Sequence, residues 1–297
     1  MKYAFINTHA HQFKISRMCR VLGVSRSGFY EWRDRPLSRR TQANLWLLQA
    51  IRRLHIESRE AYGAYKTWKV LNDRGLRYGR HRIARLRREQ GIEAKRKRRF
   101  RVVAKQHYSA IPAAPNRLAQ RFSTDLPNRV WMGDTTFIAT RAGWLFLAVM
   151  IDLYSRKVVG WAMGPRHSQE LVLAAFHMAV EHRSPRRGLI HHTDQGVLYR
   201  SDEYRSAVTA AGAQFSMSAK GNAYDNAVVE SFFSNLKNEM VHHHTFDTRE
   251  QARAAIFDYI EVFYNRQRVH SALNYKTPIQ YELENCGTVS TRPENPG

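Results

Sequence analysis

Apolar positions within residues 1–90 recur at helical spacing. Four of them lie at i, i+3, i+4 and i+7, which predicts a helix with one buried face. These residues are Ile15, Met18, Cys19 and Leu22. A turn at 23–25 and a second helix at 26–34, which ends before Pro36, follow them. This order is typical of a helix-turn-helix, whose second helix enters the major groove of DNA, although an ordinary helical hairpin has the same pattern.

The helical pattern then repeats. A connecting helix is predicted at 41–59. Its inward side is expected to carry Leu45, Leu48, Ile51 and Leu54. A short helix at 65–71, a glycine-containing turn and a longer helix at 79–90 follow, with Ile83 and Leu86 facing inward. Two small helical units in tandem are suited to contact adjacent segments of DNA.

From residue 129 the pattern changes to that of strands. Residues 130–140 are predicted to form a strand, and the continuous apolar run at 144–152 is typical of a central strand buried on both faces. Further strands are predicted at 157–163, 188–192 and 214–217, and helices at 168–182, 202–211 and 222–240. Three strands followed by alternating helices and strands indicate a mixed five-stranded sheet flanked by helices.

The predicted elements divide the chain into six segments. A helix-turn-helix with its connecting helix is expected at 1–60, a second helix-turn-helix at 61–92, a basic linker at 93–128, an α/β domain at 129–245, a helical extension at 246–286 and a flexible tail at 287–297. Prolines near the end of the linker disfavour a helix there. The fold class is therefore expected to be multidomain, with α-helical units ahead of an α/β domain.

Composition excludes several classes of protein. Hydrophobic residues make up 43% of the chain, which is enough for a packed core, and the longest apolar run, 144–151, is less than half of a bilayer span. The first residues are mixed and polar, unlike a signal peptide. Cys19 and Cys286 cannot form a disulfide scaffold or a four-thiolate zinc site. We expect a soluble protein of the reducing cytoplasm, with no membrane partner.

The charge of the chain is concentrated in its first part. The net charge is +23, and residues 1–121 carry all of it, whereas residues 122–297 are neutral. Most of these basic residues are arginines, which suit the recognition of phosphates and bases. A solvated basic surface is the alternative interpretation. The asymmetry favours nucleic-acid binding by the helical part.

Candidate DNA contacts lie on the second helix of each unit and along the linker. On the helix at 26–34, Phe29, Tyr30 and Trp32 are expected to anchor it, which leaves its other side exposed. The candidates are Arg26, Ser27, Arg33, Arg80, Arg82, Arg85, Arg88, Lys95, Arg96, Lys97, Arg98, Arg99 and Arg101. Those from residue 95 onward are suited to follow the phosphate backbone.

Three acids in the neutral half are candidates for a metal site. Asp134 lies in line with apolar residues of the first predicted strand, where an unpaired carboxylate is costly. Asp194 follows the fourth strand, at the end where α/β sheets bind ligands. Glu230 lies at the edge of the apolar stripe of the last helix, from where it can face the sheet. Together these carboxylates would form an oxygen-rich site for hard divalent cations.

Other polar residues have structural interpretations. Asp152 begins a hairpin turn and is expected to bond turn amides, and Asp225 is expected to cap the helix that follows it. Asp247 and Glu250 are interpreted as another capping pair. The histidines, including those at 191–192, match no zinc spacing, so structural or DNA-contact roles are preferred. No phosphate loop of the Walker type supports NTP hydrolysis.

Three blocks of the neutral half resemble the signatures of DDE transposases. They read WMGDTT at 131–136, HHTDQG at 191–196 and DNAVVESFF at 225–233. The 35 residues between Asp194 and Glu230, and Lys237 seven positions later, match as well. The segment 264–273 resembles the tail of the same catalytic core. Residues 18–30 resemble the opening of OrfB, the second-frame product of the insertion-sequence-3 family, and the second helical unit is similar to that family's integrase-type helix-turn-helix.

The resemblance covers about residues 3–284 and implies a retroviral-integrase-like RNase H fold. It implies that Asp134, Asp194 and Glu230 are catalytic and hold two Mg²⁺ ions, for which Mn²⁺ can substitute, and that Lys237 grips DNA beside the metals. The implied activity is cleavage and joining of DNA at transposon ends, with end and target double-stranded DNA as partners. The resemblance also implies a homo-oligomer on DNA, associated with the bacterial nucleoid. An OrfA partner or fusion is expected as well, because in such elements OrfA carries a leucine zipper and long heptads are absent from this sequence.

Two other functions fit parts of the sequence. A non-catalytic DNA-binding regulator of transposition would need only the helical units, but the intact Asp134, Asp194 and Glu230 argue against it. A nuclease of the RNase H fold would cut without joining. The tandem helical units favour a site-specific joining enzyme over such a nuclease.

Overall fold

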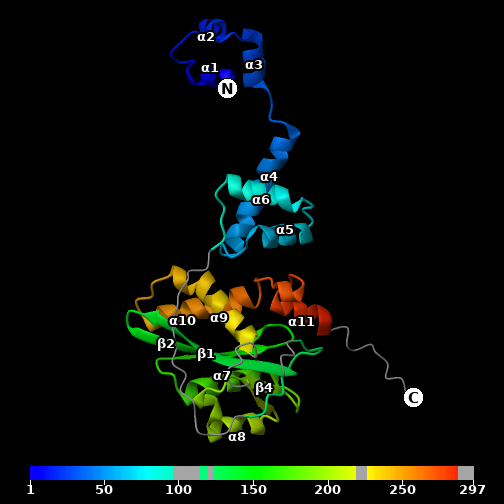
Figure 1. Cartoon of the computed structure of the whole chain (residues 1–297), viewed down its shortest axis with the longest axis vertical. Helices are drawn as coiled ribbons and strands as arrows, with labels where there is room; N and C mark the ends of the chain where they lie inside the picture. Colours follow the sequence, from blue (N-terminus) through cyan, green and yellow to red (C-terminus); the bar gives the residue numbers. More distant parts are fainter. Residues whose placement is uncertain (96–113, 119–122, 219–225, 287–297) are drawn as a thin grey trace, which may run out of the picture.

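A computed structural model describes residues 1–95, 114–118, 123–218 and 226–286. It contains a small helical unit, a second helical unit and a sheet with helices on both faces, arranged along the long axis of the molecule (Figure 1). The predicted flexible tail at 287–297 and most of the predicted linker lie outside the described residues. Within those ranges, no helix combines the length and the apolar character needed to cross a bilayer.

The first helical unit consists of α1 (Lys2–Thr8), α2 (Ile15–Leu22) and α3 (Arg26–Asp34). Helices α2 and α3 confirm the predicted pair, whereas α1 was not predicted. The cluster that joins the three helices contains Ile6, Met18, Cys19 and Phe29. Ser25 caps α3 by accepting a hydrogen bond from the backbone of Gly28. Trp32, expected to be an anchor, is 42% exposed and contacts the edge of this cluster through Tyr3 and Phe29.

The second helical unit consists of α4 (Arg39–Glu57), α5 (Ala64–Asp73) and α6 (Arg80–Glu89). The predicted inward side of α4 is partly wrong, because Leu45 is 50% exposed while Leu47 is fully buried. Residues spaced by three or four positions from Leu47 form the observed stripe, which is the spacing of one helix face. This stripe packs on Ile83 and Leu86 of α6, as predicted for these two residues.

The sheet has the predicted five strands. They are β1 (Val130–Thr140), β2 (Gly143–Asp152), β3 (Val158–Gly164), β4 (Ile190–Thr193) and β5 (Gln214–Met217). Their order in the sheet is β3-β2-β1-β4-β5, with β1, β2 and β3 antiparallel and with β4 and β5 added parallel to β1. The mixed sheet therefore agrees with the sequence prediction.

Helices cover both faces of this sheet (Figure 1). On one face lie α7 (Gln169–Arg183) and α8 (Asp202–Ala210), and on the other lie α9 (Ala227–Glu239) and α10 (Arg249–Phe257). Two apolar cores separate these layers. The predicted cap at Asp225 lies outside the described residues, and the described part of the last predicted helix begins as α9.

The C-terminal extension is helical, as predicted. A π-helical segment, Asp258–Tyr264, continues α10, and α11 (Pro278–Cys286) follows. The prediction that Asp247 and Glu250 cap α10 is wrong, because Thr248 and Gln251 form the capping box. Both residue pairs have the same spacing. It is the hydroxyl of Thr248, one position after Asp247, that accepts the backbone N–H of Gln251.

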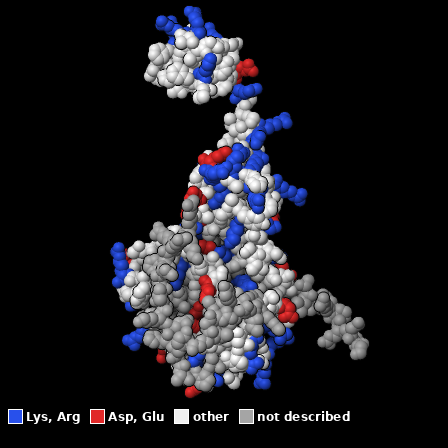
Figure 2. All heavy atoms as spheres, viewed as in Figure 1, with Lys and Arg blue, Asp and Glu red and all other residues white. Residues whose placement is uncertain are grey.

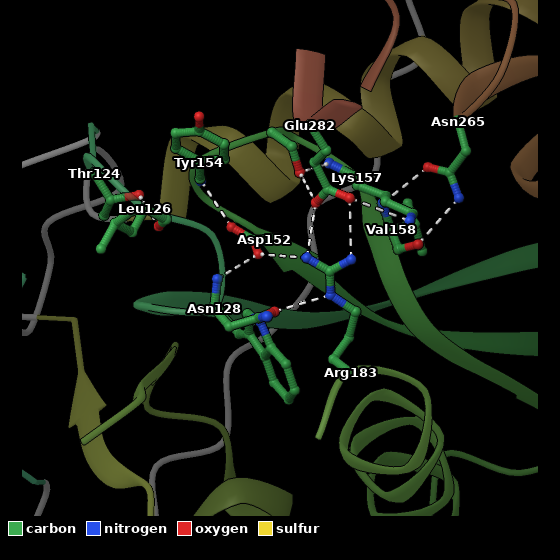
Figure 3. Close-up of polar contacts among 12 residues, drawn as sticks. Thr124, Leu126, Asn128, Asp152, Tyr154, Lys157, Val158, Arg183, Asn265 and Glu282 are labelled. Carbon is green, nitrogen blue, oxygen red and sulfur yellow. Dashed lines mark hydrogen bonds and ion pairs between the residues drawn. The ribbon is translucent and has the colours of Figure 1, made fainter. Parts of the chain in front are cut away.

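Asp152 bonds turn amides, which confirms its predicted role. It is fully buried and accepts hydrogen bonds from the backbone N–H groups of Asn128 and Tyr154 at 2.8 and 2.9 Å. Arg183, at the end of α7, lies between this carboxylate and Glu282 of α11 (Figure 3). The ends of β2 and α7 and the helix α11, which are distant in sequence, are thus joined at one corner of the sheet.

The second helical unit packs directly on the C-terminal extension. Tyr62 is buried; its hydroxyl donates to the carbonyl of Gln267 and accepts from the backbone N–H of Val269. Arg59 pairs with Asp258 at 2.5 Å. Val269 is also part of the apolar core of the helical unit. The two parts therefore share a packed interface, which fixes the second unit relative to the sheet.

Gly160 of β3 lies where α7 approaches the sheet most closely. A Cβ atom at this position would be 2.3 Å from the carbonyl oxygen of Ala175 and 2.6 Å from the Cβ of Ala179. We expect Gly160→Ala to lower the free energy of unfolding by about 1–3 kcal/mol, because overpacking forces the backbone apart. Chemical denaturation measures this loss. Gly164→Ala is the control, since its nearest atom would be at 3.4 Å, and equal losses in both variants would contradict the explanation.

Candidate active site

The sheet brings Asp134 and Asp194 side by side. Gly133 of β1 is in parallel register with Thr193 of β4, so the two acids are the next residues along two neighbouring strands. Adjacent strands are about 4.8 Å apart. Asp134 remains within β1, whereas Asp194 lies just after the end of β4. The carboxyl end of β4 therefore opens beside the middle of β1.

Backbone N–H groups orient both carboxylates. The N–H of Thr135 donates to Asp134 Oδ1 at 2.7 Å, and that of Gly196 donates to Asp194 Oδ1 at 2.9 Å. A Cβ atom on Gly196 would itself be 2.9 Å from Asp194 Oδ1. Glycine is thus the residue that lets the backbone approach this carboxylate closely enough to hold it.

Glu230 approaches this pair from α9. The helix packs against β1, and Val229 is fully buried in the core between them. Glu230, one position later, is exposed at the edge of that face, which agrees with its predicted place. Its negative charge is one of the causes that raise the pKa of Asp134. The structure therefore places all three predicted acids on the same side of the sheet.

The pKa values of Asp134 and Asp194 reflect their burial and the negative charges close to them. Burial, and then the charge of Asp194, hold the pKa of Asp134 well above its ordinary value, against the opposing hydrogen bond from Thr135. Burial likewise raises the pKa of Asp194. Both carboxylates would be stabilised in their charged form by a nearby cation.

Lys237 lies beside these acids. Its ammonium group is 5.2 Å from the centre of the Phe137 ring on β1, in a cation–π contact. Burial lowers the pKa of Lys237, and the charge of Asp134 acts in the opposite direction. The side chain is half-buried, so it is not a freely solvated lysine. It stands at the margin of the acidic site.

The described residues include no group of three His, Cys, Asp or Glu side chains placed to share one metal ion. Glu230 is exposed, whereas Asp134 and Asp194 are half-buried. The donor set itself is carboxylate oxygen, which is the preferred ligand of hard divalent cations. The chemistry of these donors therefore fits Mg²⁺.

Two residues of this site were missed from the sequence. His167 Nε2 lies 2.9 Å from the hydroxyl of Thr135, and its ring stacks on Phe146. Tyr199 is buried, and burial, then the charge of Asp134, raises its pKa well above the ordinary value. Neither residue stands in a recognisable motif, and only the tertiary fold brings them to the acids.

The paired histidines have structural roles, as preferred from the sequence. Both are fully buried. His191 Nε2 lies 2.7 Å from the hydroxyl of Tyr204, and His192 lies between Ser216 and Ser218 of the neighbouring β5 region, at 2.9 and 3.2 Å. These contacts fix β4 in the sheet and thereby position Asp194.

The candidate DNA contacts are in different environments. Basic side chains project from both helical units in the view of Figure 2. The exposed candidates are Arg26, Ser27, Arg33, Arg80 and Arg88. Half-buried candidates have partners, since Arg82 donates to Asn44 and Arg85 pairs with Glu89. The half-buried Lys95 donates its backbone N–H to Glu60. The remaining candidates, Arg96, Lys97, Arg98, Arg99 and Arg101, lie outside the described residues.

Comparisons with solved structures give distant likenesses to retroviral integrases. The HTLV-2 integrase catalytic core domain in complex with magnesium is 22% identical, with a TM-score of 0.40 over 52% of this chain and 97% of that one. The catalytic core domain of BIV integrase is 17% identical, with a TM-score of 0.42 over 55% and 99%.

Family models and curated relatives are more specific. Residues 124–223 and 230–285 match two models described as integrase core domain, and residues 42–100 match an HTH-like domain. A 31 kDa protein of insertion element IS600 from Shigella sonnei is 44% identical over 89% of this chain and 97% of its own length. Transposase InsF of insertion sequence IS3A from Escherichia coli strain K12 is 42% identical over 96% and 99%. The chain therefore belongs to the IS3 family of transposases, with an HTH-like domain ahead of an integrase core.

Proposed function

We propose that this transposase binds the ends of its insertion element and catalyses both cleavage and joining of DNA strands at a site formed by Asp134, Asp194 and Glu230. One observation carries the proposal: Asp134 and Asp194 are neighbours on parallel strands, and the charge of Glu230 reaches Asp134. A carboxylate set of this kind can hold two divalent cations, which clamp the attacking and leaving oxygens of phosphodiester transfer.

The three acids would hold Mg²⁺, with Asp134 between Asp194 and Glu230 and therefore able to serve both positions. Bound cations would activate the attacking hydroxyl and stabilise the leaving oxygen. The amides of Thr135 and Gly196 keep the two aspartates oriented before any ion binds. Lys237 would contact a phosphate of the bound strand, because its ammonium group lies near Asp134.

The helical units would supply the recognition of the element ends. The last helix of each unit, α3 or α6, carries exposed basic side chains, which can contact phosphates and base edges in the major groove. The second unit is packed on the C-terminal extension through Tyr62. DNA bound on α6 would therefore be held in a fixed relation to the acids. An oligomer on DNA and an OrfA partner remain part of the proposal.

A single assay separates this function from its two rivals. The protein is incubated with labelled element-end DNA, a target plasmid and Mg²⁺, and the products are separated and sequenced. Joined strands are the expected result, and their loss in EDTA would establish the need for a cation. Cut but unjoined ends would favour the nuclease, and bound but unchanged DNA would favour the regulator.

Neighbouring arginines of α6 are expected to have different functions. Arg88 is exposed, whereas Arg87 is 4% exposed and donates to Thr67 and to the carbonyl of Tyr62, both at 3.0 Å. Arg88→Gln should weaken end binding and reduce the slope of log affinity against log salt by about 1. Arg87→Gln should instead lower the free energy of unfolding by about 1–3 kcal/mol, because it leaves buried acceptors unpaired.

Salt-dependent binding and thermal melting of both variants test this contrast. If Arg87→Gln changed the salt slope without changing the melting temperature, or if Arg88→Gln did the reverse, the assignment of α6 as a DNA-contacting helix would be wrong.

A further inference from the structure

A cavity of about 430 Å³ lies where the second helical unit, the sheet and the C-terminal extension meet. Lys66 of α5 and Arg156 of the β2–β3 turn reach it from two sides. The N-terminal part of α9 forms another wall, through Ala227 and Ser231. Residues of the extension complete the lining, including Arg268 and His270. The cavity thus lies at the interface that fixes the helical unit on the sheet.

The lining has a strong positive character. Lys66, Arg156 and Arg268 contribute basic groups, and none of the described residues that line the cavity is acidic. Arg268 is partly neutralised, since it pairs with Glu239 at 2.7 Å behind the wall. Burial, and then the charge of Arg268, lower the pKa of Lys66 to about 8. The charged form of Lys66 is therefore disfavoured in the empty cavity, and a bound anion would stabilise it.

His270 has an unused hydrogen-bonding atom in this lining. The residue is 9% exposed, and its ring packs edge-on against Tyr264 with the ring centres 4.8 Å apart. Its Nε2 has no hydrogen-bond partner among the described residues. Burial, then the charges of Arg268 and Lys66, hold its pKa well below the ordinary value, which favours the neutral form of the ring. Buried polar atoms without a partner are rare. A neutral ring protonated at Nε2 can donate to an anionic oxygen.

Two backbone features also favour an anion in this cavity. Arg156 has φ of 61°, in the left-handed region that glycine or asparagine occupies at lower cost, so arginine at this position is not explained by the turn alone. The start of α9 contributes to the wall, and the N-terminus of a helix attracts anions through its unpaired N–H groups and dipole.

We propose that this cavity binds a phosphate group and that the group is a backbone phosphate of the element-end DNA. Ser231 in the wall directly follows Glu230 on α9, about 100° round the helix, so the cavity and the acids would lie beside adjoining faces of the same helix. One phosphate would then be held by the helical unit, the sheet turn and the extension together. The DNA source rests on the function proposed above, whereas the affinity of the cavity for a phosphate does not.

A scan of neutral linkages tests the DNA source. Element-end duplexes with one methylphosphonate at a time are bound, in EDTA, to wild type and to a Lys66→Gln/Arg156→Asn variant, in which asparagine tolerates the left-handed turn. At one linkage, or at two adjacent ones, we expect the methylphosphonate to lower the affinity of the wild-type protein for the duplex about tenfold. The same replacement should leave the affinity of the variant unchanged. The matched control Arg186→Gln/Arg205→Gln removes two exposed charges elsewhere and should lose affinity as wild type does.

A second measurement separates DNA from free phosphate. Inorganic phosphate is added at constant ionic strength while the ring signals of His270, assigned with His270→Gln, are followed by NMR. A shift of the His270 ring signals supports the proposal if the scan also finds a linkage whose neutralisation weakens binding by wild type and not by the variant. A shift without such a linkage would mean that the cavity takes free phosphate and that the DNA source is wrong. If neither is found in the folded wild-type protein, the cavity is not a phosphate site. Because neither measurement needs strand transfer, a failure of catalysis would leave both interpretable.

Discussion

Asp134→Asn is expected to bind element-end DNA as wild type does, and to lose cleavage and joining by about 10³-fold or more. The amide keeps the shape of the side chain and can still accept the hydrogen bond from Thr135. It cannot supply the negative charge that a divalent cation requires between Asp194 and Glu230. Gel assays of binding and joining with the same labelled duplex measure the two effects separately.

The same substitution is expected to raise the melting temperature in EDTA. Without a cation, burial and the charge of Asp194 disfavour the ionised form of Asp134, so removing its charge relieves a cost in the folded state. Asp125→Asn, at an exposed acid, is the control for a change in net charge and should alter neither joining nor melting. Near-wild-type joining by folded Asp134→Asn would remove this residue from the catalytic set.

Glu230→Gln is expected to abolish joining to a similar degree without altering stability. Glu230 is exposed on α9, so the amide disturbs no packing. Glu230→Asp should retain the direction of the carboxylate but shorten its reach, which predicts strong impairment in Mg²⁺ and partial recovery in the more permissive Mn²⁺. Joining rates in each metal, with circular dichroism as the folding control, measure both variants. Full Mg²⁺-dependent joining by Glu230→Gln would show that this glutamate is only a surface acid.

Moving the acid back by one residue is a test of folding and not of catalysis. Val229 is fully buried against Phe232 and Phe233 in the core between α9 and the sheet. The exchange Val229→Glu with Glu230→Val would place a charge in that core, where an unpaired ion is very costly. We expect this pair of changes to unfold the chain, in contrast to Glu230→Gln. A folded exchange variant would mean that α9 can rotate on the sheet.

The sheet and its acids could be predicted because their signals are local. Alternation marks β1, a continuous apolar run marks the central β2, and Asp134 and Asp194 could be placed within the first predicted strand and just after the fourth. Glu230 was placed correctly because a helix of known stripe fixes the direction of each neighbour. These inferences needed no contact between distant segments.

The features that were missed depend on such distant contacts. His167 reaches the acids only after the sheet has formed, and Leu45 is exposed because the partners of α4 select the face that includes Leu47. The packing of Tyr62 on the C-terminal extension joins residues about 200 positions apart. The basic cavity at that interface has no trace in any single stretch of sequence, since Lys66 and Arg156 come from different parts of the chain.

The central claim is that Asp134, Asp194 and Glu230 act as one site for divalent cations on bound DNA. Counting Mn²⁺ ions per chain by electron paramagnetic resonance, with element-end DNA present, tests it most directly. The account predicts about two bound ions for wild type, a loss of both in Asp134→Asn, and a loss of one in Glu230→Gln. The same number of ions in wild type and in folded Asp134→Asn would contradict it.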